Sequence, residues 1–414
     1  TIYNSDKLFS IIKNIFDFLQ SLPFPNEWMK QTLESYQHYL KTNNSNKNQV
    51  NFMTIIYKHG LELAQKAKVL ILECLDLSSN LENYSNYEIN FNEKLNLTNN
   101  LIEFIKNNQW SSAYSLLKDY KTSSLPRAKK NADPIIKENI KNLHDQFKEI
   151  IKNLKTNYFC CSTDELKSDV KYTYEFVDLL FEIINRFSQK YSELKHTKNF
   201  LDFSDLEQFA SILLLENING SITPSQIAKN ISKNFKEIFI DEYQDTNLIQ
   251  EYIFKSISNN EANLFMVGDA KQSIYRFRQA MPELFINKNK YYTNFDNKNF
   301  PAKIYLNQNF RSQPEVTEFI NFVFNQLMSE EIGEINYDES QFLIPAKQKS
   351  SNNYSLPEIH FLKNANVPSS EEKLYNEAKY IALKIKEMVE NKITINKDEQ
   401  LKAVQYSDFC ILLR

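Results

Sequence analysis

Residues 238–247 read IFIDEYQDTN, a short apolar run followed at once by acidic and amide side chains, and this stretch decides the fold. The triplet Ile238–Ile240 predicts a buried β-strand with Asp241 and Glu242 at its carboxyl end. Ligands of open parallel sheets bind at that end of the strands. There Asp241 can hold a Mg²⁺ ion while Glu242 polarises an attacking water. The alternative is an ordinary helix N-terminus, which Asp245 or Thr246 caps and where acids are favoured by the helix dipole.

A second strand is indicated within residues 264–278, LFMVGDAKQSIYRFR. Leu264–Val267 predicts a buried strand, and Gly268 lets the backbone leave it tightly. The amide of Gln272 would then stand at the tip of the strand, where it can sense a phosphate or a water. Acids after one strand and an amide after the next indicate a shared ligand site.

Aromatic and basic residues alternate directly after Gln272. Tyr275 and Phe277 offer flat faces, and Arg278 supplies positive charge beside them. This pattern is typical of a platform on which the bases of a single nucleic-acid strand stack. The alternative is an amphipathic segment whose aromatic side chains belong to the core.

A third segment, residues 306–312 or LNQNFRS, follows the apolar triplet Ile304–Leu306 and precedes a predicted helix. The triplet predicts another strand. Arg311 can reach a γ-phosphate as an arginine finger, and Phe310 can stack on a purine. The alternative is that Ser312 simply caps the following helix.

The first half of the chain is predicted to be helical. Up to about residue 235, apolar residues recur with helical spacing, as they do in Leu8–Leu19. A polar stretch at 78–98, rich in Asn and Ser, is predicted to be a loop.

The second half alternates between strands and helices. Helices are predicted at 248–257, 312–328 and 371–390, and further strands at Glu358–Leu362 and Asp408–Leu413. Strands separated by helices predict an α/β fold with a parallel sheet.

A basic helix is predicted within the helical half, because cations outnumber acids between Arg127 and Lys155. At about 100° per residue, six side chains fall in one narrow arc beside an apolar arc: Lys137, Lys141, His144, Lys148, Lys152 and Lys155. Through Lys141, Lys148 and Lys152 such a stripe can track duplex DNA phosphates without sequence preference. The alternative is a solvated face laced with ion pairs about one turn apart.

Composition excludes several classes of protein. The chain has 414 residues, 42% of them hydrophobic and 24% charged, and a net charge of −3, which excludes a disordered chain and a globally basic one. Its four glycines, Gly60, Gly220, Gly268 and Gly333, are too far apart to form a phosphate-binding P-loop. We therefore expect that loop to lie outside this chain, which also lacks an initiator Met, and we expect the chain alone to be inactive.

The cysteines and the hydropathy indicate in which cellular compartment the protein is expected. Cys74, Cys160, Cys161 and Cys410 form no zinc-binding or disulfide pattern, which indicates a reducing, cytoplasmic environment. No apolar run approaches the ~18 residues of a membrane span, and the N-terminus does not read as a signal peptide. No membrane partner is expected.

In this order and spacing, the three segments resemble the motifs of superfamily 1 helicases of the UvrD/Rep/PcrA group. Residues 241–247 resemble motif II, residues 267–278 motif III and residues 306–312 motif IV. Residues 201–206, LDFSDL, resemble the segment that precedes motif II in this group.

The resemblance implies a fold and its domains. The fold would be α/β, an incomplete RecA-like P-loop NTPase parallel sheet with a large all-helical insertion domain. The implied domains are a 1B-like helical insertion at 1–200, the C-terminal part of domain 1A at 201–297 and the start of domain 2A at 298–414.

The resemblance also implies ATP and Mg²⁺ as cofactors. Asp241 would be the Mg²⁺ ligand and Glu242 the catalytic base. Gln272 would couple the nucleotide to the DNA site, Arg311 would contact the γ-phosphate, and Phe310 the adenine.

The platform would bind DNA in this family. Tyr275 and Phe277 would stack on single-stranded bases, with Arg278 beside them. Phe277 stands where relatives carry Trp, which leaves a smaller face for stacking. The P-loop Lys, motifs V and VI and the nuclease acids of the family are expected outside this chain.

Within the group, the chain resembles the AddA-type helicase–nucleases, through Tyr243 in motif II and through residues 326–339. The implied partners are single- and double-stranded DNA and an AddB-type subunit. Two alternatives stay open: another UvrD- or RecB-like motor, and a non-enzymatic DNA-binding or scaffolding module. The intact Glu242 argues against the second.

Overall fold

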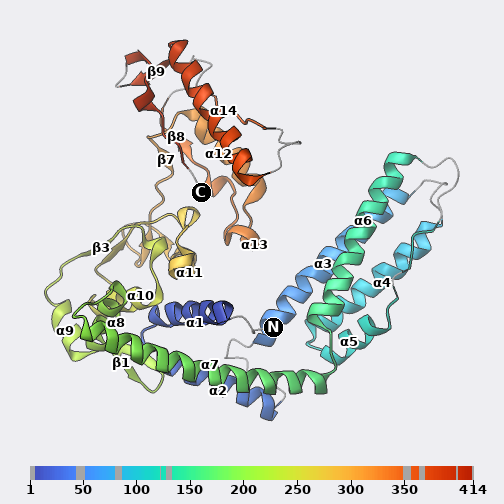
Figure 1. The fold of residues 1–414 in the computed structure, drawn as a ribbon, viewed down its shortest axis with the longest axis horizontal. Coiled ribbons are helices and arrows are strands. Elements are labelled where there is room, and N and C mark those ends of the chain that lie inside the picture. Colours follow the sequence, from blue (N-terminus) through green and yellow to red (C-terminus); the bar gives the residue numbers. More distant parts are fainter. Residues whose placement is uncertain are drawn as a thin grey trace. The chain divides into compact units, whose positions relative to one another are not determined.

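The structure is a computed structural model (Figure 1), and it describes residues 5–42, 52–79, 86–121, 123–126, 133–347, 356–362, 369–397 and 400–412. The chain divides into two compact units, Thr1–Ile212 and Leu213–Arg414. None of the helices in the described ranges combines the length and the apolar character needed to cross a membrane.

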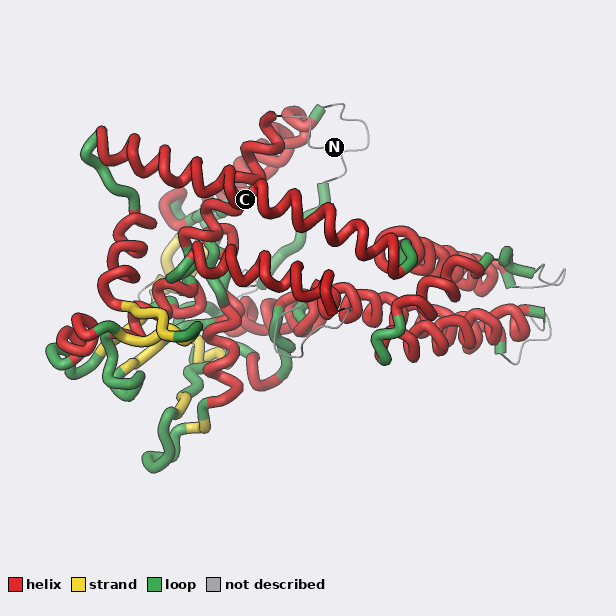
Figure 2. The backbone as a smooth tube through the Cα atoms, turned by 90° about the horizontal axis from the view of Figure 1, so that it is seen from below, coloured by secondary structure: helices red, strands yellow, loops and turns green. Residues whose placement is uncertain are grey.

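The described part of the first unit is helical (Figure 2). A short π-helical turn at Leu154–Tyr158 directly follows its sixth helix. In chain order the helices are α1 (Ser5–Gln20), α2 (Pro25–Thr42), α3 (Phe52–Ser78), α4 (Tyr87–Lys106), α5 (Trp110–Asp119), α6 (Pro134–Asn153), α7 (Thr163–Thr197) and α8 (Phe203–Leu214).

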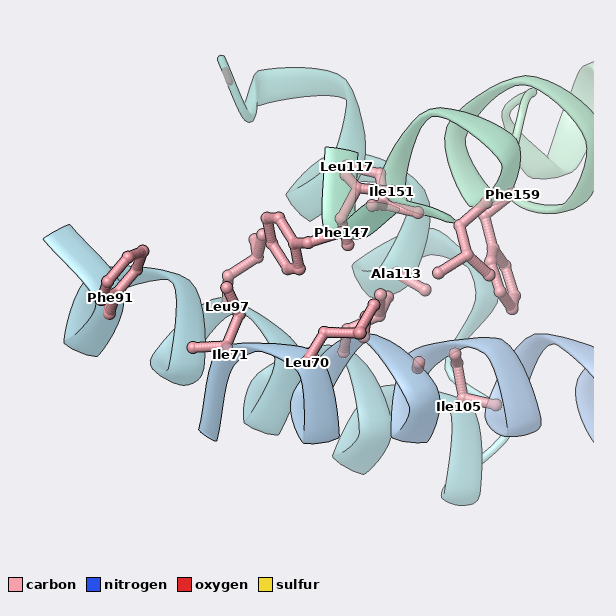
Figure 3. Packing of buried hydrophobic residues seen from close by; sticks show 14 of the residues in the cluster. Leu70, Ile71, Phe91, Leu97, Ile105, Ala113, Leu117, Phe147, Ile151 and Phe159 are labelled. Carbon is pink, nitrogen blue, oxygen red and sulfur yellow. The ribbon is translucent and has the colours of Figure 1, made fainter. Parts of the chain in front are cut away.

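Helices α3, α4, α5 and α6 share one apolar core (Figure 3). Ile71 of α3, Phe91 of α4, Leu117 of α5 and Phe147 of α6 are all fully buried in it. Each helix buries one face because its apolar residues recur every three or four positions. Since burying one large apolar side chain stabilises a fold by about 1.5–3 kcal/mol, this cluster holds the four helices together.

The same core encloses two ionisable side chains. Lys94 donates hydrogen bonds to Asn90 and, at 3.0 Å, to Ser123 Oγ. His144 is fully buried, and neither of its ring nitrogens has a hydrogen-bond partner among the residues that the structure describes. Burial lowers the pKa of Lys94 to about 8. Burial, with the charges of Lys94 and Lys148, lowers the pKa of His144 to about 4.

The loop predicted at 78–98 is wrong for residues 87–98, which belong to α4. Tyr87, Phe91 and Leu101 are buried along one face of this helix. The polar residues that suggested a loop, such as Asn92 and Asn96, lie on its exposed face. Residues 80–85 of the predicted loop lie outside the described residues.

Charged side chains shape the connection from α7 to α8. The buried Lys195 pairs with Asp202 at 2.9 Å and with Asp205 at 2.6 Å. The two acids also cap one another's backbone, because the Asp205 N–H donates to Asp202 Oδ1 at 3.0 Å and the Asp202 N–H to Asp205 Oδ2 at 2.9 Å. The LDFSDL segment therefore includes the first turn of α8, and its two acids join that turn to Lys195 near the end of α7.

The second unit alternates short strands with helices, as expected. Its helices are α9 (Gln226–Ser232), α10 (Leu248–Ser256), α11 (Pro282–Tyr291), α12 (Pro314–Leu327), α13 (Glu330–Gly333) and α14 (Ser370–Glu390). Its strands are β1 (Leu215–Ile218), β2 (Ser221–Pro224), β3 (Ile238–Ile240), β4 (Leu264–Met266), β5 (Thr293–Asn294), β6 (Ala302–Lys303), β7 (Gln308–Asn309), β8 (Ile344–Pro345), β9 (Thr394–Lys397) and β10 (Gln400–Ala403).

Within the described ranges, each sheet has two strands. The pairs β3–β4, β5–β6 and β7–β8 are parallel, and the hairpins β1–β2 and β9–β10 are antiparallel. The predicted strands at 238–240 and 264–267 are confirmed as β3 and β4, with Ile238 opposite Leu264. Their predicted burial is wrong within the described residues, because Phe239 and Phe265 are 73% and 52% exposed. The helical reading up to about residue 235 stops earlier, at the hairpin β1–β2.

Three predicted strands are wrong within the described residues. Residues 304–306, 358–362 and 408–412 have no strand pairing, and Leu413 lies outside the described residues. Most of their apolar side chains, including those of Leu306 and Phe361, are exposed. An apolar run becomes a buried strand only where neighbouring strands and helices cover it, and the described residues provide no such cover here.

Candidate functional site: strand ends carrying motifs II and III

The turn after β3 carries the two predicted acids. Asp241 and Glu242 follow the strand directly, and both are exposed. Glu242 has φ 48° and ψ 42°, a left-handed conformation that residues with a Cβ rarely adopt. Its N–H donates to Asp241 Oδ1 at 2.9 Å. Because strained backbone of this kind clusters at functional sites, the turn is a candidate site on conformation as well as on sequence.

Gln244 links this turn to the next strand. Its side chain is only 1% exposed. Gln244 Nε2 donates to Glu242 Oε2 at 2.6 Å, and Gln244 Oε1 accepts the N–H of Asp269 at 2.9 Å. The backbones are also joined, because Val267 N–H donates to Ile240 O at 2.9 Å. The ends of β3 and β4 therefore form one hydrogen-bonded edge.

Gly268 permits this close approach. A Cβ at position 268 would lie 2.6 Å from Gln244 Oε1 and 3.2 Å from the Gln244 backbone nitrogen. Any larger residue would therefore push the Gln244 amide aside. The glycine, predicted to let the backbone leave the strand tightly, has this second and more specific role.

Asp269 continues the connection to Gln272. Asp269 Oδ2 accepts from Gln272 Nε2 at 2.9 Å, and Oδ1 pairs with Lys271 Nζ at 2.8 Å. Although burial opposes it, hydrogen bonds from Lys271 and Gln272 lower the pKa of Asp269, which is therefore a carboxylate at neutral pH. A series of hydrogen bonds therefore connects four residues, which we call the Glu242–Gln272 network: Glu242, Gln244, Asp269 and Gln272.

Tyr243 anchors the turn in the interior. It is fully buried, and its hydroxyl donates to Glu251 of α10. Burial and this carboxylate raise the pKa of Tyr243, so the phenol stays protonated. Lys288 of α11 pairs with Glu251 at 3.3 Å and with Glu261 at 2.8 Å. Tyr243 thus connects the turn to α10, and Lys288 connects α10 to α11, while the carboxylates of the turn stay exposed.

The alternative that Asp245 or Thr246 caps the next helix is wrong. Asn247 caps α10, and its side chain accepts the N–H of Gln250 at 2.9 Å. Burial and the charge of Glu242 raise the pKa of Asp245, and its Oδ1 is buried without a hydrogen-bond partner. The acids of this turn are not explained by helix capping.

The predicted stacking residues gather on a short 3₁₀ turn, Arg276–Arg278. The ring centroids of Tyr275 and Phe277 lie 5.9 Å apart. The Arg278 guanidinium lies 5.5 Å from the first centroid and 5.6 Å from the second. All three side chains are exposed. The alternative, that the aromatic side chains of this segment belong to the core, is therefore wrong.

Arg311 and Phe310 lie after another sheet, the pair β7–β8. Asn309 Oδ1 accepts the N–H of Arg311 at 3.1 Å and that of Ser312 at 2.8 Å. Both predicted side chains are exposed. Among the described residues, no hydrogen bond or ion pair joins Arg311 to Asp241 or Glu242. The structure thus gathers motifs II and III but leaves motif IV separate from them.

Ser312 does not cap the following helix. The residue at the N-cap of α12 is Gln313, which makes no side-chain capping hydrogen bond, and the helix begins at Pro314. The alternative reading of this segment is wrong.

The basic stripe on α6 needs correction at one position. Lys141 and Lys152 are exposed, and Lys148 is half-buried and pairs with Asp145 at 3.1 Å. His144, assigned to the same arc, instead points into the apolar core. It stands four residues after the buried Ile140, so helical spacing places it on the packed face. Residues 127–132 lie outside the described residues.

Sequence reasoning missed three contributors to the site: Gln244, Asp269 and Asn309. Each is polar and flanks a predicted residue. The available signal was position, because each lies within four residues of the end of a strand that was predicted, correctly or not. Their hydrogen bonds could not be deduced, since Gln244 and Asp269 are 25 positions apart.

Comparison with known proteins shows the family of the chain. Residues 23–293 match the UvrD/REP helicase N-terminal domain, which implies an α/β fold of the P-loop NTPase type. The A subunit of an ATP-dependent helicase/nuclease from Bacillus pumilus is 34% identical over 433 residues, covering 100% of this chain and 34% of its own length. Its namesake in Acetivibrio thermocellus is 36% identical over 342 residues, covering 80% and 27%.

The chain therefore spans about a third or less of the length of these curated relatives. The matched domain covers more than half of the chain, including the acids after β3 and the platform after β4. The chain belongs to the UvrD/REP helicase family.

Proposed function

We propose that this chain is part of an AddA-type protein, an ATP-dependent DNA helicase/nuclease that unwinds and processes DNA double-strand breaks for recombinational repair. The observation that carries the proposal is the Glu242–Gln272 network, which gathers a candidate base and a candidate phosphate sensor at the ends of two parallel strands. The names of the similar proteins support the same activity.

The residues present fit magnesium and ATP. Mg²⁺ is usually bound through one or two carboxylates and otherwise by water and phosphate oxygens. The exposed carboxyl group of Asp241, at the carboxyl end of β3, can supply such a ligand. When bound, magnesium–ATP supplies the phosphoryl group and the divalent charge that neutralises it.

The residues of this chain would then divide the work. Gln244 holds Oε2 of Glu242, which leaves Oε1 to accept the proton of the attacking water. Gln272 would sense the phosphate, Arg311 would contact the γ-phosphate, and Phe310 would stack on adenine. Motif IV would meet the strand ends when the nucleotide draws the two RecA-like parts together.

Tyr275, Phe277 and Arg278 would hold single-stranded DNA beside the nucleotide site. Stacking on such rings contributes about 1–3 kcal/mol per base. On α6, Lys141, Lys148 and Lys152 would follow duplex phosphates.

The proposed domains are the 1B-like insertion at 1–200, the C-terminal part of 1A at 201–297 and the start of 2A at 298–414. The sheet would belong to an incomplete RecA-like core. The proposed partners are both forms of DNA and an AddB-type subunit.

Substituting Glu242→Gln in the intact protein tests the assigned chemistry. We expect DNA-stimulated ATP hydrolysis to fall by about 10²–10⁴-fold, the usual contribution of a general base, while ATP binding remains. The matched control is Glu237→Gln, an exposed acid just before β3, which should hydrolyse ATP normally.

A normal rate in Glu242→Gln would refute the role of this residue. If the unsubstituted protein bound DNA without hydrolysing ATP, the non-enzymatic alternative would replace the proposal. A motor of UvrD type would hydrolyse ATP but show no nuclease activity.

A further inference from the structure

We propose that Gln244 is a positioning residue for ATP hydrolysis, connecting Gln272 to the carboxylate of Glu242 through Asp269. This inference rests on the proposed function, in which Glu242 is the base and Gln272 faces the phosphate. Gln244 itself touches neither water nor nucleotide in this scheme, and it acts through the Glu242 side chain.

The hydrogen bonds fix which way the Gln244 amide faces. The Asp269 N–H requires an acceptor, so Oε1 must face it, at 2.9 Å. Nε2 then faces Glu242 Oε2, at 2.6 Å, and gives a carboxylate the donor it requires. With the amide reversed, two donors would meet at Asp269 and two acceptors at Glu242. The assignment therefore has one consistent solution.

The surroundings prevent Gln244 from moving independently. Its side chain is buried, and its backbone carbonyl accepts from Ser273 Oγ at 3.3 Å. The absence of a Cβ at Gly268 leaves just enough room for Oε1. By contrast, the Glu242 side chain is exposed. An exposed carboxylate samples several rotamers unless a fixed donor selects one, so Gln244 decides where Oε1 of Glu242 points.

Asp269 makes the connection responsive to Gln272. Its backbone N–H donates to Gln244, while its side chain accepts from Gln272 at 2.9 Å. One residue therefore contacts both amides. A displacement of Gln272 by a bound phosphate would move Asp269 and thereby change the hydrogen bond that orients Gln244.

The test is Gln244→Glu in the intact protein, an isosteric change that replaces the Nε2 donor by a second carboxylate oxygen. We expect kcat for ATP hydrolysis at pH 8 to fall by about 10²-fold, as for a misplaced catalytic group, with KM for ATP changed less than about twofold. Neighbouring carboxylates share a proton more readily as the pH falls. At pH 6 the carboxyl group introduced by Gln244→Glu is protonated and donates again, so the deficit should shrink.

The matched control is Gln250→Glu, the same change in the capping amide of α10. The carboxylate can still accept the Asn247 N–H that Gln250 Oε1 accepts at 3.2 Å, so kcat should stay near the unsubstituted value at both pH values. A second variant, Gly268→Ala, displaces the Gln244 amide without adding charge. It should lower kcat as well, but with no recovery at pH 6.

The outcomes separate this inference from the proposed function. If Glu242→Gln is inactive while Gln244→Glu has a kcat within about twofold of the unsubstituted protein, the network does not position the base, although the function stands. A pH-independent loss in Gln244→Glu, equal to that of Gly268→Ala, would also overturn the inference. If Gln244→Glu does not fold, full activity in Gly268→Ala overturns it instead. Absence of ATP hydrolysis in the unsubstituted protein removes the proposed function itself.

Discussion

The α3–α6 core of the first unit and the strand ends of the second are held together by different forces. In the core, large side chains such as Phe147 are entirely buried. On β3 and β4, Phe239 and Phe265 are 73% and 52% exposed, and the contacts that shape the site are hydrogen bonds of buried amides. Burial of apolar side chains contributes much stabilising free energy but does not fix their orientation. Hydrogen bonds fix the orientation of side chains but contribute little net free energy. We therefore expect substitutions in the two regions to affect different measurements.

The largest expected effect is that of Phe147→Ala on stability. Removing a buried aromatic ring leaves a cavity, and such changes cost about 3–5 kcal/mol. Both tryptophans, Trp28 and Trp110, lie in the first unit, so their fluorescence during urea unfolding reports on that unit alone. The free energy of unfolding from this signal should fall by that amount.

The matched variant in the second unit is Phe239→Ala. Its ring contacts Phe265 at a centroid distance of 5.7 Å but is mostly in solvent. We expect a loss of about 1 kcal/mol or less, measured by hydrogen exchange of β3 in the 414-residue chain. Equal losses in the two variants would show that both regions depend on apolar burial, and the contrast would fail.

A second prediction concerns acid sensitivity of the same core. Burial, then the charges of Lys94 and Lys148, lower the pKa of His144 from 6.5 to about 4, while Asp145 opposes the shift. Between these values the unfolded chain binds a proton that the folded chain does not, so stability falls as the pH falls through this window. The loss should reach about 2 kcal/mol at pH 5, with no contribution at pH 7.5.

Urea unfolding at pH 7.5 and pH 5, followed by tryptophan fluorescence, measures this loss. His144→Leu should reduce the drop between the two pH values by that amount. His59→Gln is the control, because His59 is exposed on α3 and pairs with Glu62 at 3.1 Å. If His144→Leu and the unsubstituted chain lose equal stability on acidification, His144 is not neutral in the folded state.

The contrast between the regions also explains what the sequence could predict. Strands β3 and β4 and the helices α10, α12 and α14 were predictable because their apolar residues are arranged locally as in a strand or a helix. The helical spacing that revealed the packed face of α6 also included His144, between Ile140 and Phe147. Its polar character led to the wrong assignment, although its position on the helix indicated the core.

Other features depend on partners far away in sequence. The run at 304–306 has the apolar character of a strand, but no local pattern shows whether a sheet covers it. The acids of motif II were predictable from their place after a strand. Gln244 was not, because its function depends on Asp269 and on the missing Cβ of Gly268. A site built from directed contacts is thus less visible in sequence than a core built from burial.

The smallest expected effect tests whether charge alone can hold a segment of the second unit. The Arg276 guanidinium contacts Glu283 at 2.8 Å and also Glu334, which follows α13. Its side chain is 57% exposed, and exposed ion pairs contribute only about 0–1 kcal/mol. Arg276→Gln should therefore raise hydrogen exchange in residues 330–337 by no more than about fivefold.

The salt dependence of that exchange gives the sharper comparison. Exposed charges are screened at high ionic strength, so the difference between Arg276→Gln and the unsubstituted chain should vanish at about 1 M salt. Lys290→Gln, which removes a pair with Glu330 at 3.3 Å between two more exposed side chains, should have a still smaller effect. A hundredfold rise that persists in salt would mean that Arg276 holds the segment as firmly as Phe147 holds the core. Polar contacts in the second unit would then contribute as much stabilising free energy as apolar burial does in the first, and the proposed difference between the two regions would be refuted.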